Sequence, residues 1–423
     1  MIRNTRCQIS LGTALAVALM GFGPIAPVSA SSTEPAKAGV PIAAQDDDKE
    51  EATEQVVVSS TRTQVLMKDE PIHVEAVPAE EIEENLTEAP GSVSTVFLEL
   101  PGMHVESAAP GLGGAVIQLR GMPGRNTLVL MDGLPLLGAE PDAFGILQTP
   151  PLDLERAEVI KGAASALYGA SALAGVLNLK SRVPNSDSSV LASVDSNGGR
   201  QASAFLTAPG TGWSGTLMAS VDSQSRKDVD SDGWTDLPFH RRFTFRPRLW
   251  WNPAQDQSLF VTAGIMDEDR RGGTMPSAAL PEGYPFSESL HTQRFDAGAV
   301  SHSDIESGSL DGHFSFTWVH KDSTFGPLRA NPILRTGYAE EAWSDRVHGH
   351  ILVLGVAFQH DDLSEGSLRG VGYNYNVPAF FAQDEFAPKD WLTIAGSVRV
   401  DIHNRYGTFV SPHLSALLHG DGP

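Results

Sequence analysis

A short acidic segment holds the residues whose types and spacing come nearest to a metal site. Asp228, Asp230 and Asp232 alternate along the chain, and Gly233 and Asp236 follow them. Alternating carboxylates before a glycine match the first half of a calcium loop, in which the side chains at positions 1, 3 and 5 converge. The glutamate expected at position 12 of such a loop is missing. The segment therefore predicts either a calcium site or an acidic loop that is exposed to solvent.

The sequence contains no recognisable catalytic pattern. The glycine-bracketed segment from Gly162 to Gly169 is followed by Ala and Ser and not by the Lys of a phosphate-binding loop, and neither HExxH nor GxSxG occurs. His348 and His350 stand two residues apart and are interpreted as a surface pair. The only cysteine, Cys7, lies near the start of the chain. We therefore expect no enzyme activity and no cofactor, calcium excepted.

The composition argues against nucleic-acid binding and against a helical membrane protein. The 423 residues include 52 acidic and 30 basic side chains, a net charge of -22, with no basic stripe that could neutralise phosphates. Beyond residue 30 there is no run of about 18 apolar residues. Part of the acidic excess falls at 46–54, and we expect residues 31–53 to form a disordered acidic linker.

The first 30 residues have the organisation of a secretory signal peptide. Arg3 and Arg6 precede an apolar run from Ile9 to Met20, and a small-residue pattern ends at Ala30. The apolar run is too short for a membrane anchor. We expect the signal peptide to be removed after Ala30.

From Ser188 onward, apolar and polar residues alternate with the period of a β-strand. Between Trp213 and Asp222 one face is apolar and the other polar, and the segment from Leu392 to Asp401 repeats this pattern. The pattern predicts twelve strands, at 188–196, 200–208, 212–223, 240–251, 257–268, 291–301, 308–321, 337–347, 351–361, 374–387, 391–401 and 408–418.

The connections between these strands fall into two sizes. Those after the second, fourth, sixth, eighth and tenth strands are short, whereas those after the third, fifth, seventh and ninth are mostly long. Such alternation is typical of a transmembrane β-barrel, which has short periplasmic turns and long extracellular loops. A soluble β-sandwich, the alternative, would need no such alternation.

Two glycine-rich units, Gly111 to Gly138 and Leu154 to Lys180, precede these strands. So many small residues imply close packing of the backbone rather than a catalytic cleft. The elements expected in them are strands at 116–119 and 127–131, a hairpin turn at Asp132 and Gly133, strands at 158–161 and 176–179, and a helical turn at 165–168.

Together with Leu98 to Val105, these units resemble the plug domain of TonB-dependent outer-membrane receptors, whose pattern runs roughly LPGV, IRG, LVLLDGVP and IERIEVIKGPASALYGSGAIGGVINI. The motifs match in order and spacing. Phe381 to Phe386 and Phe409 to Leu414 also resemble barrel strands of this family, so the resemblance runs from about residue 54 to 418. The fold that it implies is mainly β, with an α+β plug followed by an antiparallel transmembrane β-barrel.

The resemblance also implies domain limits and site residues. It places a TonB box region at 54–64, in which Val56, Val57 and Val58 pair with TonB, a plug at 65–183 and the N-terminal part of the barrel at 184–423. In the family, the charged motif residues face polar groups on the barrel wall; a role in plug packing alone is the alternative. The motif residues are Arg120, Gly121, Asp132, Gly133, Arg156, Glu158, Lys161, Gly162, Tyr168, Gly169 and Asn178.

The function implied by the resemblance is active transport of a scarce ligand across the outer membrane of a bacterial cell. The partners would be TonB with its inner-membrane proton-driven complex, the outer-membrane lipid, and a ligand such as a ferric siderophore, cobalamin or another metal chelate. Some cobalamin receptors use extracellular calcium near the ligand, which makes the acidic loop worth testing. The alternatives are a ligand-binding or signalling receptor without transport, and a non-functional truncated receptor.

The number of strands departs from the family. Outer-membrane transporters of this kind close with about 22 strands, and only twelve are expected before the sequence ends at Pro423. An open sheet edge in lipid costs several kcal/mol for each unpaired backbone group. The expectation is therefore a barrel truncated after about twelve strands, either a fragment of a longer product or a receptor that does not work as it stands.

Overall fold

The structure is a computed structural model. It describes residues 74–88, 93, 96–97, 100–108, 110–137, 145–162, 165–184, 187–275, 285–364, 370–389 and 391–418. The chain divides into two compact units, residues 1–47 and 48–423, and all described residues belong to the second. The expected signal peptide, the acidic linker and Val56 to Val58 of the TonB box lie outside the described residues.

The plug, whose described residues run from 74 to 184, is built on a small mixed sheet. Its strands follow the order β1, β5, β6, β4, and only β4 and β6 run parallel. A separate hairpin joins β2 to β3. The elements are β1 (Val74–Val77), α2 (Ala79–Glu88), β2 (Met103–Ala108), η2 (Pro110–Leu112), β3 (Gly114–Leu119), η3 (Gly124–Asn126), β4 (Thr127–Met131), β5 (Leu154–Lys161), α3 (Ser165–Tyr168), η4 (Ala170–Ala172) and β6 (Gly175–Ser181).

The plug has a hydrophobic core of its own. Ile82 of α2, Phe97, and Leu119, Leu154 and Leu177 of the strands are fully buried in one cluster. Burial of each such side chain stabilises a fold by about 1.5–3 kcal/mol. The plug is therefore held together by its own apolar contacts.

No helix in the described part of the chain is long and apolar enough to cross a membrane.

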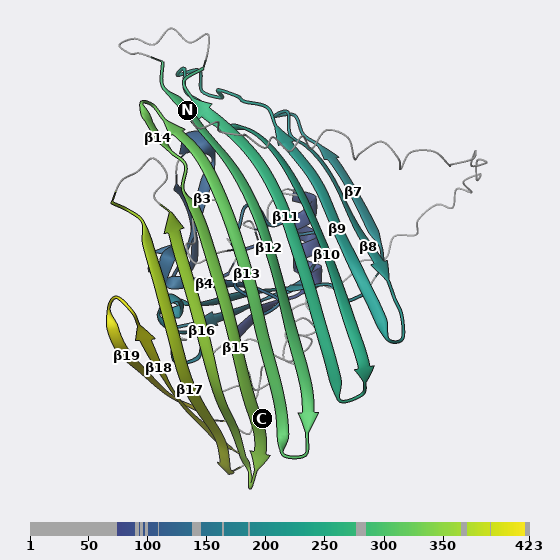
Figure 1. Cartoon of the computed structure of the whole chain (residues 1–423). Coiled ribbons are helices and arrows are strands. Elements are labelled where there is room, and N and C mark those ends of the chain that lie inside the picture. The colour runs from purple at the N-terminus through teal and green to yellow at the C-terminus, as the bar shows by residue number, and fades with distance from the viewer. Residues whose placement is uncertain are drawn as a thin grey trace, which may run out of the picture. The chain divides into compact units, whose positions relative to one another are not determined.

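The rest of the described chain forms one large antiparallel sheet, which curves around the plug (Figure 1). Its strands follow chain order from β7 to β19, apart from the short β14, which pairs with β13 only. Among the described residues β7 and β19 each pair with a single strand, so the sheet is open. The strands are β7 (Ser189–Val194), β8 (Arg200–Ala208), β9 (Trp213–Gln224), β10 (Phe239–Ala254), β11 (Gln257–Gly273), β12 (Ser287–Ile305), β13 (Gly308–Phe325), β14 (Leu328–Ala330), β15 (Ile333–Val347), β16 (His350–Ser364), β17 (Tyr373–Lys389), β18 (Leu392–His403) and β19 (Gly407–Leu418).

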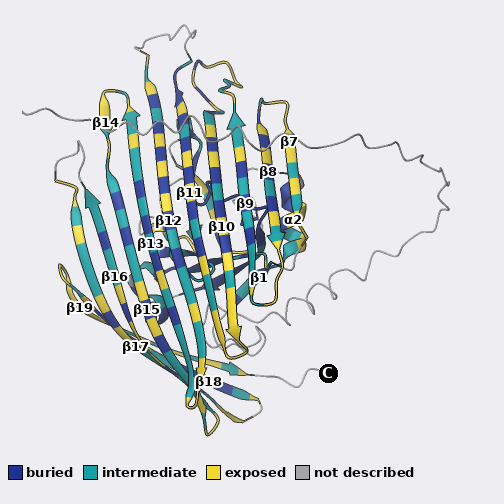
Figure 2. Ribbon diagram, turned by 45° about the vertical axis from the view of Figure 1, so that its right-hand side comes forward, coloured by how far each residue is buried: buried dark blue, intermediate teal, exposed yellow. Residues whose placement is uncertain are grey.

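Burial alternates along these strands, because successive side chains of a strand point to opposite faces (Figure 2). In β10, Arg242, Arg246 and Arg248 are buried on the inward face, whereas Phe243 and Leu249 are exposed on the outward face. The predicted arrangement, apolar outward and polar inward, is confirmed. We call the edge with long connections the loop side and the edge with short connections the turn side.

All twelve expected strands are present, and most are longer than predicted, at the loop side and, in β10 and β12, also at the turn side. The predicted loop from Asp269 to Leu290 is shorter, because β11 and β12 continue to pair up to Gly273 and Ser287. The inward residue Arg270 bonds to the plug there, which keeps the ladder ordered beyond the apolar part of the strands. The short strand β14 lies inside another expected loop and was not predicted.

The hairpin predicted at Asp132 and Gly133 is only partly correct. Both residues have positive φ, 53° and 81°, as a tight turn of this type requires. A single bridge between Met131 and Leu134 spans the turn, and β4 pairs in parallel with β6 instead. The turn thus ends a central strand of the plug rather than joining two strands of a hairpin.

Candidate functional site

Five residues of the plug motifs take part in hydrogen bonds and an ion pair behind the turn after β4. The Asp132 carboxylate accepts bonds of 2.9 Å from the backbone N–H and the hydroxyl of Ser181. Gly133 donates its N–H to Asn178 over 2.9 Å, and Asn178 donates to the buried Glu158 over 3.2 Å. Glu158 also pairs with Arg156 at 3.0 Å. The motif residues therefore fix the loop between β4 and β5 against β6.

Lys161 and Arg120 bear on the expectation that charged motif residues face the barrel wall. Lys161 pairs with Glu75 and donates to the carbonyl of Pro101 over 2.6 Å, so its bonds stay inside the plug. Arg120, in a strained left-handed conformation with φ 53°, is exposed, and its guanidinium group lies next to Gly162. For Lys161 the structure favours the alternative, a role in plug packing, because a buried ammonium group needs nearby acceptors.

The segment after β5 does reach the wall. The carbonyl of Leu167, at the end of α3, accepts a hydrogen bond of 3.2 Å from Arg399 of β18. Tyr168 packs against the second apolar cluster of the plug. A Cβ on Gly169 would come within 3.6 Å of both Arg399 and Asp401, and Gly169 has a φ of 82°. A glycine there allows both the turn and the close approach to the wall.

Arg248 of β10 makes the deepest contact between the wall and the plug. Its Nη1 donates to the Asp153 carboxylate over 2.6 Å, and its Nε lies 3.5 Å from Asp132. The side chain of Arg248 is 0% exposed and that of Asp153 is 3% exposed. One inward arginine therefore neutralises two plug carboxylates, and one of them, Asp132, belongs to the predicted motif.

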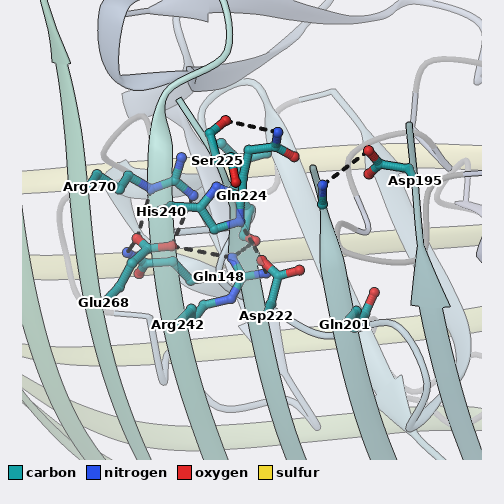
Figure 3. A network of polar contacts seen from close by, with 12 residues as sticks. Gln148, Asp195, Gln201, Asp222, Gln224, Ser225, His240, Arg242, Glu268 and Arg270 are labelled. Carbon is teal, nitrogen blue, oxygen red and sulfur yellow. Dashed lines mark hydrogen bonds and ion pairs between the residues drawn. The ribbon is translucent and has the colours of Figure 1, made fainter. Parts of the chain in front are cut away.

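A second network lies nearer the loop side, around Glu268 of β11 (Figure 3). Glu268 accepts bonds from the plug residue Gln148 at 2.7 Å and from Arg270 at 2.9 Å. Arg242 lies 3.4 Å from Glu268 and donates to the carbonyl of Leu147 over 2.6 Å. Burial alone would raise the pKa of Glu268, but Arg270 and Arg242 with the Gln148 bond lower it to about 2. Glu268 is therefore a carboxylate that binds the plug through its charge.

The outward-facing residues show where this network lies along the strands. Asp267 and Asp269, the neighbours of Glu268, point outward, whereas Ile265 on the same face is 50% exposed and apolar. A lipid-facing surface is apolar and carries charges only beyond its edges. The network of Glu268 therefore lies on the loop side of the apolar belt.

The tip of the plug hairpin, at η2, fits into a slot in the wall. A Cβ on Gly272 would lie 1.7 Å from the carbonyl of Gly111, and a Cβ on Gly111 would lie 2.1 Å from Glu288 Oε2. Arg270 donates to the carbonyl of Leu112 over 3.0 Å. Burial raises the pKa of Glu288, and Arg226 opposes this rise. Glycines on both sides of the contact bring the plug backbone against the wall.

A cavity of about 190 Å³, lined by both polar and apolar side chains, separates the plug from the wall on the other side of the motif turn. Tyr338 donates its hydroxyl to Glu340, and His313 lies 3.9 Å from the same carboxylate. Drug-sized ligands occupy pockets of roughly 300 Å³ or more, so this cavity is large enough for water molecules but too small for a metal chelate. The plug residues Asp132, Gly133, Tyr168 and Lys180 and the wall residues Asp311, His313, Tyr338, Glu340 and Gln359 are among those that line it.

The acidic loop gathers three of its four expected ligands. Carboxylate oxygens of Asp228, Asp230 and Asp236 lie within 4.8 Å of one another. Asp232 is outside this group and accepts the N–H of Trp234 over 2.7 Å. The Asp228 carboxylate accepts backbone N–H groups as well, so the loop is ordered by its own carboxylates. The arrangement leaves calcium binding as a prediction.

Sequence reasoning missed the inward arginines of β10 and the carboxylate of β11 that hold the plug. Arg242, Arg246 and Arg248 recur every second or fourth residue within an aromatic strand, which was the available signal. Arginine in such a pattern indicates an inward polar face, but the pattern does not identify the residue that each arginine contacts. The plug partners of Arg242 and Arg248 lie 95 residues away in the sequence, whereas Arg246 pairs with Asp296 of the sheet itself.

Comparisons with known proteins agree with this arrangement. Residues 67–176 match the TonB-dependent Receptor Plug Domain family. The chain is 26% identical over 422 residues to the iron-regulated outer membrane virulence protein of Vibrio cholerae, covering 95% of this chain and 62% of that protein. The chain belongs to the TonB-dependent outer-membrane receptors. This receptor chain spans 62% of the length of that curated relative.

Two further similarities concern a transporter and a solved structure. The receptor chain is 24% identical over 375 residues to the vitamin B12 transporter BtuB of Photobacterium profundum, covering 85% of this chain and 58% of BtuB. The siderophore receptor PirA from Pseudomonas aeruginosa superposes with a TM-score of 0.63 at 20% identity, over 82% of this chain and 59% of PirA. The expectation that the chain is not an enzyme is confirmed, since members of this family are receptors and transporters.

Proposed function

We propose that this chain takes part in TonB-dependent transport of a metal chelate across the outer membrane. The observation that carries the proposal is the polar contact between plug and wall, above all the bonds of Arg248 to Asp132 and Asp153. They hold a plug with its own core inside a sheet whose inward face is polar. A ligand released below the plug would reach the periplasm.

The chemistry of the contact suits a plug that must be moved by force. Each plug carboxylate that contacts the wall is bound by a guanidinium group. Breaking such a buried pair without replacing the lost partner costs about 3–5 kcal/mol. Water can replace these partners when the plug moves, because water-mediated bonds are nearly as favourable as direct ones. The plug would thus stay closed at rest and open under an external force without exposing its own core.

The force would come from TonB, through the box at Val56 to Val58. A short β-branched segment before the plug can add a strand to the sheet of a partner. Movement of the plug would then widen the cavity beside Asp132 until a chelate can pass. The ligand would be a ferric siderophore, cobalamin or another metal chelate, and the signal peptide would be removed after Ala30.

The test separates binding from transport. In cells that carry the receptor, Val57→Pro should abolish uptake of radiolabelled ligand and leave surface binding unchanged, because proline removes a ladder donor. Val57→Thr, which keeps both the N–H group and the β-branched shape, is the matched control and should transport normally. Unchanged uptake by the proline variant would contradict the coupling assigned to this segment.

A further inference from the structure

Buried arginines gather on one part of the inward face of the wall, at β10, β11 and β12. They are Arg242, Arg246, Arg248, Arg270 and Arg294. Four of them donate hydrogen bonds to the plug, while Arg246 pairs with Asp296 of the wall itself. This part of the wall can release the plug only if several buried bonds of charged groups break, which is costly.

The wall beside the cavity at the motif turn differs in charge. This cavity lies mainly against β13, β15 and β16, and the wall residues that line it include the carboxylates of Asp311 and Glu340 and the imidazole of His313. Among the described wall residues that line it there is no Lys or Arg. A Cβ on Gly133 of the motif turn would lie 3.7 Å from His313 Nε2, so the turn faces these side chains. The plug thus meets the wall here across a gap that is lined by carboxylates.

The carboxylates continue from the cavity to the turn side of the wall. Glu340 is paired with His313, and Asp311, two residues nearer the turn, is paired with His302. His302 Nδ1 lies 2.7 Å from Asp311, and its Nε2 lies 3.3 Å from Asp304, whose side chain is 61% exposed. We call Glu340, Asp311 and Asp304 the carboxylate line. It leads from the cavity to the turn-side edge of the sheet, where a transported ligand would leave.

A line of like charges along a narrow gap selects ligands by their charge. Clefts lined by one sign of charge raise the local concentration of counter-ions by about 10–10³, and low-dielectric walls strengthen the effect. Lys180 of the plug also lines the cavity, but it would move away with the plug, whereas the carboxylate line belongs to the wall and stays. A positively charged group that passes there would meet three carboxylates in turn, and a negatively charged group would be repelled by each.

We propose that the ligand passes the plug along β13, β15 and β16, and that the carboxylate line selects a chelate with positive rather than negative charge on its surface. This inference rests on the proposed transport function and narrows its substrate class. Asp311 and Glu340 are then specificity-determining residues. They act on the chelate while it moves, because the cavity at rest is too small to hold it. The arginines of β10 to β12 keep the other side of the plug attached.

The experiment locates the passage and measures its charge preference without a ligand. The receptor carries Cys7→Ser, which removes its only cysteine, and either Ser344→Cys in the cavity wall of β15 or Ser220→Cys at a buried inward position of β9. It is kept in outer-membrane fractions, and urea loosens the plug in steps. Two methanethiosulfonate reagents, one with a trimethylammonium group and one with a sulfonate group, then modify the cysteine. Each rate is divided by the rate of the same reagent with free cysteine.

Ser344→Cys should react at a lower urea concentration than Ser220→Cys, because the gap at the cavity is already present. At Ser344→Cys the cationic reagent should react about tenfold faster than the anionic one, and Asp311→Asn combined with Glu340→Gln should bring the two rates within about twofold of each other. Glu341→Gln is the matched control. Glu341 is exposed on the outward face, opposite Val356, so its loss should leave the tenfold ratio unchanged.

Three results would overturn the proposal: reaction of Ser220→Cys at the same or a lower urea concentration, equal rates of the two reagents at Ser344→Cys, or a ratio that the double carboxylate variant leaves unchanged. Neither TonB nor a ligand takes part in the measurement. Such a failure is therefore distinct from failure of the transport proposal, which the Val57→Pro uptake test detects.

Discussion

Arg248 of β10 donates a hydrogen bond of 2.6 Å to Asp153, and this bond joins the large sheet to the plug. We expect Arg248→Met to weaken the attachment of the plug by about 3–5 kcal/mol, because it leaves the buried carboxylates of Asp153 and Asp132 without the guanidinium group that contacts them both. The measurement is the urea concentration at which the plug becomes sensitive to protease in the detergent-solubilised receptor.

The matched control for this variant is Arg271→Met. Arg271 pairs with Asp269 on the outward face and its side chain is 61% exposed, so its loss should cost no more than about 1 kcal/mol. Adding Asp153→Asn to Arg248→Met should recover part of the loss, since it removes one unpaired charge. Equal protease sensitivity of the two arginine variants would show that Arg248 does not hold the plug.

Much of the fold could be predicted because the sheet obeys a local rule. A period of two is visible in the sequence wherever one face meets lipid and the other meets polar groups, as in β10 and β18. The strand β1 and the helix α2 were not predicted, because neither segment has a strong hydrophobic periodicity in the sequence. The four residues of β1 form a strand only because β5 lies beside them.

The candidate site could be predicted on the plug side only. The turn at Asp132 and Gly133 is recognisable from residue types that tolerate positive φ. Its partner Arg248 could not be named, because that contact depends on how the sheet curves around the plug, which no local pattern encodes. In the acidic loop the same limit applies: Asp232 was expected among the four ligands, whereas the fold leaves it outside the group that the other three form.

Adding a single methyl group to a glycine in the slot around η2 should loosen the plug tip. The size of this effect should differ between the two glycines. Gly272→Ala should displace the plug tip and destabilise its attachment by about 1–3 kcal/mol, because the new Cβ meets the backbone carbonyl of Gly111, which cannot move alone. Gly111→Ala should cost less, since it meets the end of the Glu288 side chain, which can rotate away. Hydrogen exchange at the amides of residues 111–113 measures both effects.

Glu288→Ala supplies the discriminating control for these glycine variants. Combined with Gly111→Ala it should restore the exchange protection of the parent, and combined with Gly272→Ala it should not. Gly212→Ala, where no atom lies within 4 Å of the new Cβ, should have no effect on the plug tip. Rescue of both glycine variants by Glu288→Ala would contradict the close contact of the two backbones.

The attachment of the plug should depend on pH through Glu268. Its pKa in the folded protein is lowered to about 2 from an ordinary value of 4.5, so its contribution is present above pH 4.5 and is lost as the pH falls towards 2. Protease sensitivity of the plug should rise in that window. Glu268→Gln should be more sensitive at pH 7 and should change less between pH 4.5 and 2.

The contribution of Glu288 to the attachment of the plug should change with pH in the opposite direction. Its pKa is raised by burial, so its contribution to the plug tip is full below its unfolded pKa and is lost as the pH rises through the folded value. Glu288→Gln should therefore protect the amides of residues 111–113 from exchange better than the parent at pH 7 and equally well at low pH. Poorer protection of the glutamine variant at pH 7 would show that the ionised carboxylate stabilises the plug tip in its slot.

The acidic loop gives the last prediction, calcium binding with the weak affinity, about 0.1–1 mM, of extracellular sites. Terbium can replace calcium, and Trp234, two residues from Asp236, should sensitise its luminescence. Asp230→Asn and Asp236→Asn should abolish the signal, whereas Asp232→Asn should keep it, because Asp232 lies outside the group of converging carboxylates. A calcium chelator should also weaken binding of the transported ligand. Equal loss of luminescence in the Asp232 variant, or none in any variant, would return this segment to an acidic loop whose carboxylates only bind backbone N–H groups.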